Sequence, residues 1–361
     1  MKNTRELRAI DFFCGAGGLT YGLSSAGIKV LAGIDIDKEC KDTYEENNRG
    51  SKFIRADMKK LTPQKLEKRL KIKPNDDCMI FAGCSPCQYW TQIHTQKGKS
   101  LETKYLLGDF LKLIKYFKPG YVIVENVEGI LSHKDESKLT ELLDFLDRNK
   151  YAYDYDKINA MYYGIPQRRR RFLLVASRIG KGIKLPQADK EHILKVRDVL
   201  GADKGFPSIG AGHVDNTDFL HTTTDLSDKN IKRLKLTPHD GGTRLNWKDN
   251  LELQINAYKD KDKTFSDTYG RMFWDIPSPT ITTKFHSISN GRFAHPTEDR
   301  GISLREGATL QSFPRTYIFR GNGIGSIARQ IGNAVPPELA GRVGIVIISH
   351  HQRSECNGRR Q

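Results

Sequence analysis

Six short apolar runs, separated by stretches long enough to form helices, constrain the fold of this chain more than any other feature of its sequence. The runs cover residues 7–13, 29–36, 52–57, 78–83, 121–127 and 171–177. Runs of this length and composition are typical of strands that are buried on both faces of a sheet. Helix-length segments such as 17–27 and 105–117 lie between several of them. The pattern therefore predicts an α/β domain in which a mostly parallel sheet is covered by helices.

The composition changes near residue 186. Residues 186–300 are rich in Gly, Thr, Asp, Lys and His and contain few long apolar runs, which predicts a second, smaller and irregular domain. Near the end of the chain, Pro336 and Pro337 suit the entry and first turn of a final helix. We expect a first domain over residues 1–185, completed by 325–361, and a second domain over 186–324.

The charge balance favours a polyanionic partner. The chain has 361 residues, with 59 Lys and Arg against 43 Asp and Glu, and a formal net charge of +16. Such a balance suits nucleic acid but names no reaction. We expect no membrane span, because no apolar run approaches the roughly 18 residues it needs. Six cysteines in a chain of this length are too sparse for a disulfide scaffold, so we expect a cytoplasmic protein.

A glycine-rich turn follows the first apolar run. Gly15 and Gly17 allow the backbone to pass close to a ligand, and Thr20 stands where the dinucleotide-binding pattern would need its third glycine. The next two runs end in Asp35 and Asp57. Acids at successive strand ends suit the hydroxyls and base of a nucleoside bound at the carboxyl edge of the sheet. The alternative is that these acids are ordinary solvated or helix-capping residues.

Two cysteines, Cys84 and Cys87, flank Ser85 and Pro86 directly after the fourth apolar run. Zinc would need further ligands, and the chain has no second C-x-x-C and no H-x-x-x-H, so we expect no metal. A thioredoxin-like redox pair, two inert thiols, and a single nucleophile at Cys87 with Cys84 as a small apolar filler remain as readings.

Polar groups at two other strand ends bear on this choice. Glu125 and Asn126 end the fifth run, where a carboxyl group can act as a proton donor. The basic run 168–171 precedes the sixth, and Arg169 and Arg171 share a face if that strand alternates. For Arg168 and Arg170 we expect solvent exposure or phosphate contact.

Taken together, these segments resemble the cytosine-C5 DNA methyltransferase family. Its ordered motifs correspond to "DFFCGAGG", "GCSPCQ", "ENV", "QRRRR", "REGATLQSFP" and "QIGNAVPPELA". Six motifs in the family's order, from residue 8 to about residue 345, are highly specific. The resemblance implies a Rossmann-like class I methyltransferase fold, double-stranded DNA as substrate, a flipped cytosine and S-adenosyl-L-methionine as methyl donor.

The resemblance also implies catalytic roles. Cys87, positioned by Pro86, would attack C6 of the cytosine, Glu125 would donate to or hydrogen-bond N3, and Arg171 would bind the O2 side and orient Glu125. Supporting roles would fall to Arg169, Asn126 and Gln88. Gln88 begins a loop resembling the family's DNA-closing loop, from which Tyr89 and Trp90 depart.

For the cofactor, the resemblance implies a site built from several strand ends. Its residues would be Phe13, Gly15, Gly17, Asp35, Ile36, Asp57, Met58, Leu106 and Asn333. The second domain would recognise the DNA target, and Thr280 and Ile281 match a Thr-aliphatic pair of the family. The family more often has Ala for Gly307 and Arg for Thr309, which leaves the local support of that domain open.

Other functions stay open at this point. A branch of the same family methylates a tRNA, and a non-catalytic DNA-binding regulator could keep the fold. We expect a monomer that acts in the bacterial cytoplasm as part of a restriction-modification system, with a possible cognate endonuclease acting separately.

Overall fold

The computed structural model describes residues 6–85, 105–259, 261–262 and 264–358, and divides the chain into two compact units. Unit 1 comprises residues 1–159, 170–188 and 334–361, and unit 2 comprises 160–169 and 189–333. The sequence had assigned 160–169 and 325–333 to the first domain. They join unit 2 because the turn before the last strand bonds to the segment around residue 278, which belongs to the irregular domain.

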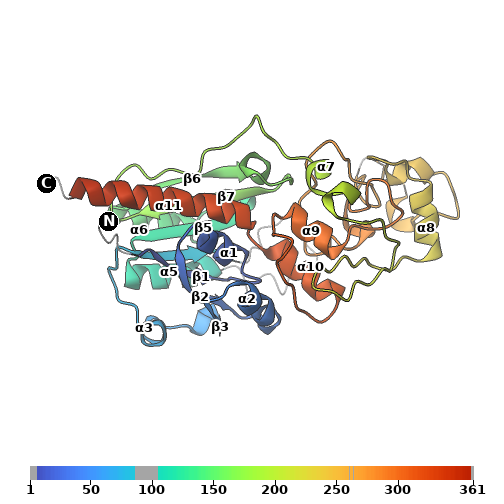
Figure 1. Cartoon of the computed structure of the whole chain (residues 1–361). Coiled ribbons are helices and arrows are strands. Elements are labelled where there is room, and N and C mark those ends of the chain that lie inside the picture. The colour runs from blue at the N-terminus through green and yellow to red at the C-terminus, as the bar shows by residue number, and fades with distance from the viewer. Residues whose placement is uncertain (1–5, 86–104, 260, 263, 359–361) are drawn as a thin grey trace. The chain divides into compact units, whose positions relative to one another are not determined.

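Unit 1 is built around a seven-stranded sheet with the order β3-β2-β1-β4-β5-β7-β6 (Figure 1). The strands are β1 (Arg8–Phe12), β2 (Lys29–Asp35), β3 (Lys52–Arg55), β4 (Met79–Gly83), β5 (Tyr121–Val127), β6 (Ala152–Asn159) and β7 (Arg170–Ser177). β1 to β5 pair in parallel, whereas β7 is antiparallel to both β5 and β6. The predicted α/β class and mostly parallel sheet are confirmed.

β6 is the one strand that the apolar runs did not reveal. Its sequence, AYDYDKIN, alternates polar and aromatic residues, and most of its side chains are only half-buried. The strand lies at an edge of the sheet, where one side has no neighbouring strand, so its sequence does not need the continuous apolar character of the central strands.

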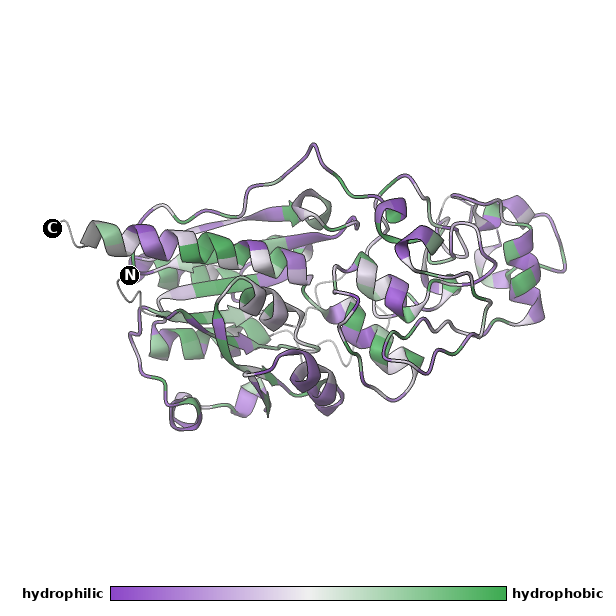
Figure 2. Cartoon of the chain, in the orientation of Figure 1, coloured by the Kyte–Doolittle hydropathy of each residue, from purple (hydrophilic) through white to green (hydrophobic). Residues whose placement is uncertain are grey.

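Helices cover the sheet of unit 1. They are α1 (Gly18–Ser25), α2 (Lys41–Asn47), α3 (Pro63–Leu70), α5 (Leu106–Phe117), α6 (Leu139–Arg148) and α11 (Pro337–Gly358). α1 packs on α11, and α5 packs on both α3 and α6. Phe12, Phe81 and Phe110 meet in the core between the strands and α5. Figure 2 shows the apolar residues concentrated in the central strands and the inner faces of these helices.

Unit 2 has little regular structure. Its helices are α7 (Val196–Val199), α8 (Asp228–Lys235), α9 (Leu304–Leu310) and α10 (Ile324–Asn333). Three fully buried arginines, Arg271, Arg300 and Arg305, take the place that large apolar side chains have in unit 1. The Arg271 guanidinium donates to the carbonyls of Thr237 and Leu234 at 2.9 and 2.8 Å. Buried guanidinium donors thus satisfy loop carbonyls that no helix or sheet would pair.

One helical stretch, Ile324–Ser354, is long and apolar enough by composition to cross a membrane. Within the structure, however, 61% of its most apolar window is buried, as is common for a core helix of a soluble protein.

Candidate functional site

Glu125 lies near the carboxyl end of β5 and is buried, with 3% of its surface exposed. β5 pairs with β7 in a register that sets Val127 opposite Arg171. Arg171 therefore reaches back along the strand pair, and its Nε lies 3.4 Å from Oε1 of Glu125. The two side chains that the sequence selected for the catalytic centre form an ion pair in unit 1.

Cys84 also contacts this carboxylate. Its thiol donates to Oε2 of Glu125 at 2.7 Å. The sequence analysis treated Cys84 as a packed filler, but β4 and β5 pair with Gly83 opposite Val124, so the next residue of each strand is brought side by side. The missing signal was the register between the two strands, because the apolar runs show where strands lie but not how they are aligned.

Asn126 points to the segment that leads to the predicted nucleophile. Its side-chain amide donates to the hydroxyl of Ser85 at 3.0 Å and to the Ser85 carbonyl at 3.4 Å. Both residues are buried. The bonds hold the last described residue before the loop, whereas Pro86, Cys87 and Gln88 lie outside the described residues, as do Tyr89 and Trp90.

The basic run divides between exposed and buried side chains. Arg168 and Arg170 are exposed, as expected. Arg169 is buried, and its guanidinium donates to the carbonyls of Ile281 and Gly332 at 3.3 Å, all within unit 2. Arg169 and Arg171 thus have different partners in different units, and the contacts of Arg169 are those of a residue that holds the backbone of unit 2 together.

The glycine turn joins two of the predicted cofactor residues. Gly15 and Gly17 adopt positive φ angles of 49° and 87°, which glycine accepts without strain. The Gly15 N–H donates to Oδ2 of Asp35 at 2.8 Å, and the Asp37 N–H donates to Oδ1 at the same distance. Burial raises the pKa of Asp35, while these two N–H donors oppose that rise. A Cβ placed on Gly15 would meet no atom within 4 Å, so the turn faces open space.

The other predicted cofactor residues of unit 1 lie near the same edge of the sheet. Ile36 is 61% exposed directly after β2, an unusual setting for a large apolar side chain. Phe13 has a positive φ of 62° and is partly buried. Asp57 caps a short 3-10 turn by accepting the Lys59 N–H at 3.0 Å. Met58 is buried, Leu106 begins α5, and Asn333 is exposed at the end of α10 in unit 2.

Asp11 is a buried acid that the sequence analysis missed. Its Oδ2 accepts the N–H and hydroxyl of Thr20 at 3.1 and 2.7 Å, whereas Oδ1 has no hydrogen-bond partner among the described residues. Burial raises the pKa of Asp11 from 3.8 to about 7, although the bonds from Thr20 lower it. The carboxyl group ties β1 to α1 beneath the glycine turn.

Thr280 and Ile281 are held by the residues that precede β7. The Thr280 hydroxyl donates to the Arg168 carbonyl at 2.7 Å, and the Ile281 N–H donates to Oε1 of Gln167 at 2.9 Å. Ile281 is fully buried. Their role in DNA recognition stays a prediction.

The segment 303–313 supports unit 2 through an ion pair. Arg300 donates to both carboxylate oxygens of Glu306, at 2.7 and 2.9 Å, and Ser303 and Glu306 form a capping box at the start of α9. Burial raises the pKa of Glu306, but the bonds and charge of Arg300 outweigh it and lower the pKa to about 2. A Cβ on Gly307 would lie 2.2 Å from the ring of Phe285, which explains why alanine does not stand here.

No group of three or more His, Cys, Asp or Glu residues able to hold a metal ion occurs in the part of the chain that the structure describes. The expectation of a metal-free site stays a prediction.

Comparison with known proteins identifies related sequences along nearly the whole chain. A family model described as C-5 cytosine-specific DNA methylase matches residues 7–349. The Type II methylase M.HgiDII of Herpetosiphon aurantiacus is 38% identical over 339 residues, which is 92% of each chain. The Type II methyltransferase M.Sau96I of Staphylococcus aureus is 29% identical, covering 97% of this chain and 77% of the relative.

Solved structures share the fold. A candidate DNA modification methyltransferase encoded within a prophage in E. coli matches with a TM-score of 0.71 at 21% identity, over 95% of this chain and 99% of the other. The Dnmt2 methyltransferase of S. pombe matches with a TM-score of 0.59 at 17% identity, over 96% and 99% of the two chains.

Proposed function

Since the chain belongs to the C-5 cytosine-specific DNA methylase family, we propose that it transfers a methyl group to C5 of a cytosine flipped out of double-stranded DNA. The observation that carries this proposal is the buried Glu125 carboxylate, which has Arg171 on one oxygen and Cys84 on the other at the carboxyl edge of the sheet. A regulator that only binds DNA would have no need of this arrangement.

In the proposed reaction the Cys87 thiolate adds to C6 of the cytosine. Negative charge then develops in the ring, and Glu125 neutralises it by donating to or hydrogen-bonding N3. Arg171 holds the Glu125 carboxylate and contacts the O2 side. C5 accepts the methyl group, loses its proton, and expulsion of Cys87 restores the aromatic ring. Asn126 acts as a positioning residue, because its amide holds the backbone of Ser85 two residues before Cys87.

The edge of the sheet fits a nucleoside-bearing methyl donor, and S-adenosyl-L-methionine is the donor we propose. When bound, it supplies the methyl group. The open space at Gly15 leaves room for the methionine portion, and the exposed Ile36 offers an apolar surface for a purine. The Asp35 oxygens already accept two N–H groups, so its role would include holding the glycine turn in shape. Phe13, Gly17, Asp57, Met58, Leu106 and Asn333 would complete the site.

Unit 2 is proposed as the target-recognition domain, with Thr280 and Ile281 at its base-reading segment. Its loops have the irregular structure on which base-reading side chains are commonly carried. A restriction-modification role in the bacterial cytoplasm, with an endonuclease acting separately and the methyltransferase acting as a monomer, completes the proposal.

Duplex DNA containing 5-fluorocytosine at every cytosine tests the nucleophile. Fluorine at C5 prevents loss of the C5 proton, so a covalent protein–DNA adduct should persist on a denaturing gel when S-adenosyl-L-methionine is added. We expect the adduct with the native chain and with Cys356→Ser, a matched variant at an exposed cysteine, but not with Cys87→Ser. An equal yield from Cys87→Ser would overturn the assignment. Transfer of labelled methyl groups to total RNA and not to genomic DNA would overturn the choice of DNA.

A further inference from the structure

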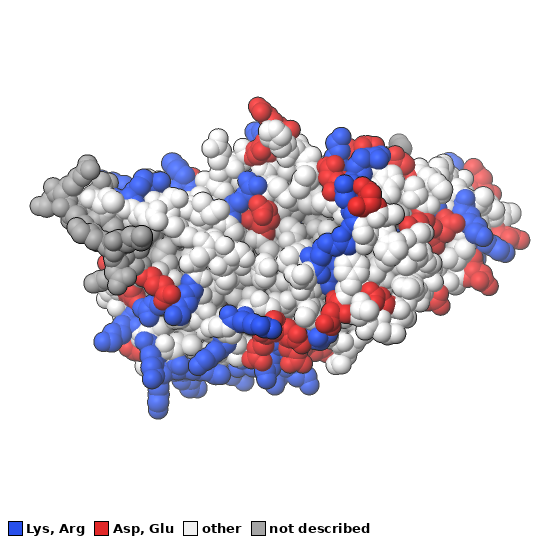
Figure 3. All heavy atoms as spheres, viewed as in Figure 1, with Lys and Arg blue, Asp and Glu red and all other residues white. Residues whose placement is uncertain are grey.

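Residues 52–73 form the most basic segment of unit 1. They contain nine Lys and Arg against two acids, an excess of seven charges within 22 residues, while the whole chain has an excess of 16. The nine cations are Lys52, Arg55, Lys59, Lys60, Lys65, Lys68, Arg69, Lys71 and Lys73. We call this set the β3–α3 basic surface. All nine side chains are exposed, and Figure 3 shows Lys and Arg gathered where Figure 1 places β3 and α3.

These cations are not neutralised by their neighbours. None of the nine forms an ion pair with another residue in the described part of the chain. The two acids of the segment have other contacts: Glu67 accepts a hydrogen bond from the Tyr116 hydroxyl, and Asp57 caps the Lys59 N–H. Surface lysines usually occur among acids of opposite charge, so an unpaired set of this size produces a local positive potential.

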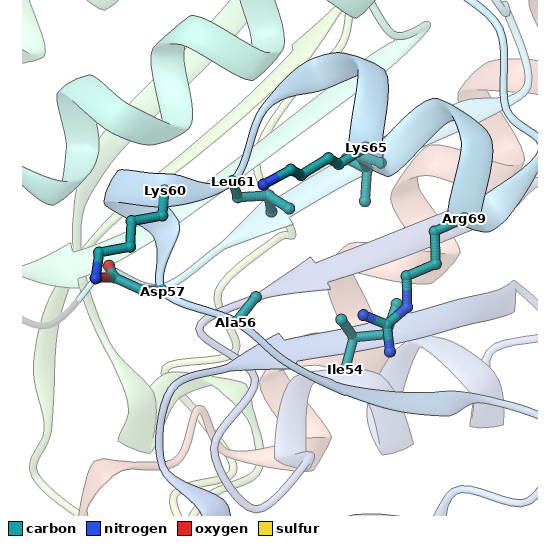
Figure 4. A pocket seen from close by; sticks show the side chains of 8 residues that line it. Ile54, Ala56, Asp57, Lys60, Leu61, Lys65 and Arg69 are labelled. Carbon is teal, nitrogen blue, oxygen red and sulfur yellow. The ribbon is translucent and has the colours of Figure 1, made fainter.

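A pocket lies within the surface. Ile54, Leu61 and Leu66 form apolar walls, and Lys60, Lys65 and Arg69 extend around it (Figure 4). Lys65 and Arg69 are four residues apart on α3 and so share one face of the helix. Its volume of about 240 Å³ is below the roughly 300–1,000 Å³ of small-molecule sites, which favours a phosphate group over a whole nucleoside.

Protection of an open sheet edge explains only part of the set. β3 is an edge strand, and charged side chains such as Lys52 and Arg55 discourage pairing with another chain. Lys60, Lys65, Lys68 and Arg69 lie on the 3-10 turn and the helix that follow, where no strand pairing needs to be prevented.

We propose that the β3–α3 basic surface binds the phosphate backbone of duplex DNA outside the catalytic site, with one phosphate seated among Lys60, Lys65 and Arg69. The contact is independent of sequence, and it raises the affinity for DNA without touching the target cytosine. The proposal takes duplex DNA from the proposed function, but binding to this surface does not depend on methyl transfer.

The test is a triple variant, Lys60→Gln, Lys65→Gln and Arg69→Gln, in the full chain. A matched control, Lys150→Gln, Lys181→Gln and Lys184→Gln, removes the same charge from exposed lysines of unit 1 outside the surface. Fluorescence anisotropy with a 40-base-pair duplex, without cofactor and over a range of salt concentrations, gives Kd and its salt dependence. Thermal unfolding checks that both variants are folded.

We expect the triple variant to bind DNA about tenfold or more weakly than the control. The slope of log K against log salt should be smaller by about two to three, since each lost phosphate contact removes roughly 0.9. Equal Kd and slope for the two variants would overturn the proposal, as would a loss confined to duplex RNA. Weaker S-adenosylhomocysteine binding with unchanged DNA binding would assign the pocket to the cofactor. Failure of the Cys87 experiment with this result intact would overturn only the proposed reaction.

Discussion

At the scale of single residues, the structure separates groups that do chemistry from groups that hold them. Asn126 belongs to the second kind, because both of its described contacts are to Ser85, at the end of the segment before the Cys87 loop. Asn126→Ala should lower kcat by about 10- to 100-fold, with little effect on the Kd of S-adenosylhomocysteine. The rate of adduct formation on 5-fluorocytosine DNA should fall in parallel.

A control for the loss of an amide side chain is Asn149→Ala, since Asn149 donates only to the end of α6. Ser85→Ala removes the other partner, and the effects of the two substitutions should be less than additive by about 1 kcal/mol. Full additivity in this double-mutant cycle would contradict the positioning role.

Ile36 allows the cofactor site to be tested without disturbing the core. Its side chain is 61% exposed, so Ile36→Ala should leave the free energy of unfolding nearly unchanged. If the side chain packs on adenine, the variant should bind S-adenosylhomocysteine about 5- to 20-fold more weakly, because roughly 1–2 kcal/mol of apolar contact is lost. Ile345→Ala, at a similarly exposed isoleucine of α11, is the control for calorimetric titration. Equal affinities would remove Ile36 from the site.

Asp11 gives the stability of the protein a specific pH dependence. Its pKa rises on folding from 3.8 to about 7, so between these values the folded state holds a proton that the unfolded state releases. The free energy of unfolding therefore falls as the pH rises through this window, by up to roughly 1.4 kcal/mol per pH unit. Asp11→Asn keeps an acceptor for Thr20 and removes the titration. In urea unfolding, the variant should gain stability relative to the native chain between pH 5 and pH 8, and a constant difference would contradict the assignment.

At the scale of elements, the strands of the central sheet could be predicted from sequence because burial on both faces demands continuous apolar runs. β6 could not, since it is a half-buried edge strand with polar alternation. The contact between Cys84 and Glu125 was equally hidden. It depends on the alignment of β4 against β5, and a single chain shows no pattern that fixes the alignment of two buried parallel strands.

The helix α9 shows how a departure from the family pattern can be accommodated locally. Gly307 leaves room for the buried ring of Phe285, so Gly307→Ala should lower the free energy of unfolding by about 1–3 kcal/mol despite the better helix propensity of alanine. Gly325→Ala in α10 is the control, because a Cβ there meets no atom within 4 Å. Adding Phe285→Leu to Gly307→Ala should cost less than the sum of the single changes in chemical denaturation. A neutral Gly307→Ala would show that the ring moves aside.

At the scale of the whole molecule, the chemistry and the proposed recognition lie in different compact units. The described residues of the catalytic centre and most of the predicted cofactor residues belong to unit 1, whereas Arg169, Thr280, Ile281 and Asn333 belong to unit 2. The sequence indicated two domains from its change of composition, but not that the ten residues before β7 join the second. That assignment follows from hydrogen bonds to the segment near Ser278, which is distant in sequence.

This division predicts separate footprints for the two ligands in hydrogen exchange. S-adenosylhomocysteine should slow exchange in peptides over residues 13–18 and 33–37, because the glycine turn and the end of β2 would lose solvent access and local motion. A 40-base-pair duplex without cofactor should instead slow exchange over 278–283 of unit 2 and over 59–71. Peptides at the opposite end of the strands, around Tyr121 and its partner His350, should respond to neither and provide the internal control. Protection by S-adenosylhomocysteine confined to unit 2 would contradict the proposed division of labour, because the open turn at Gly15 would then lie outside the cofactor site.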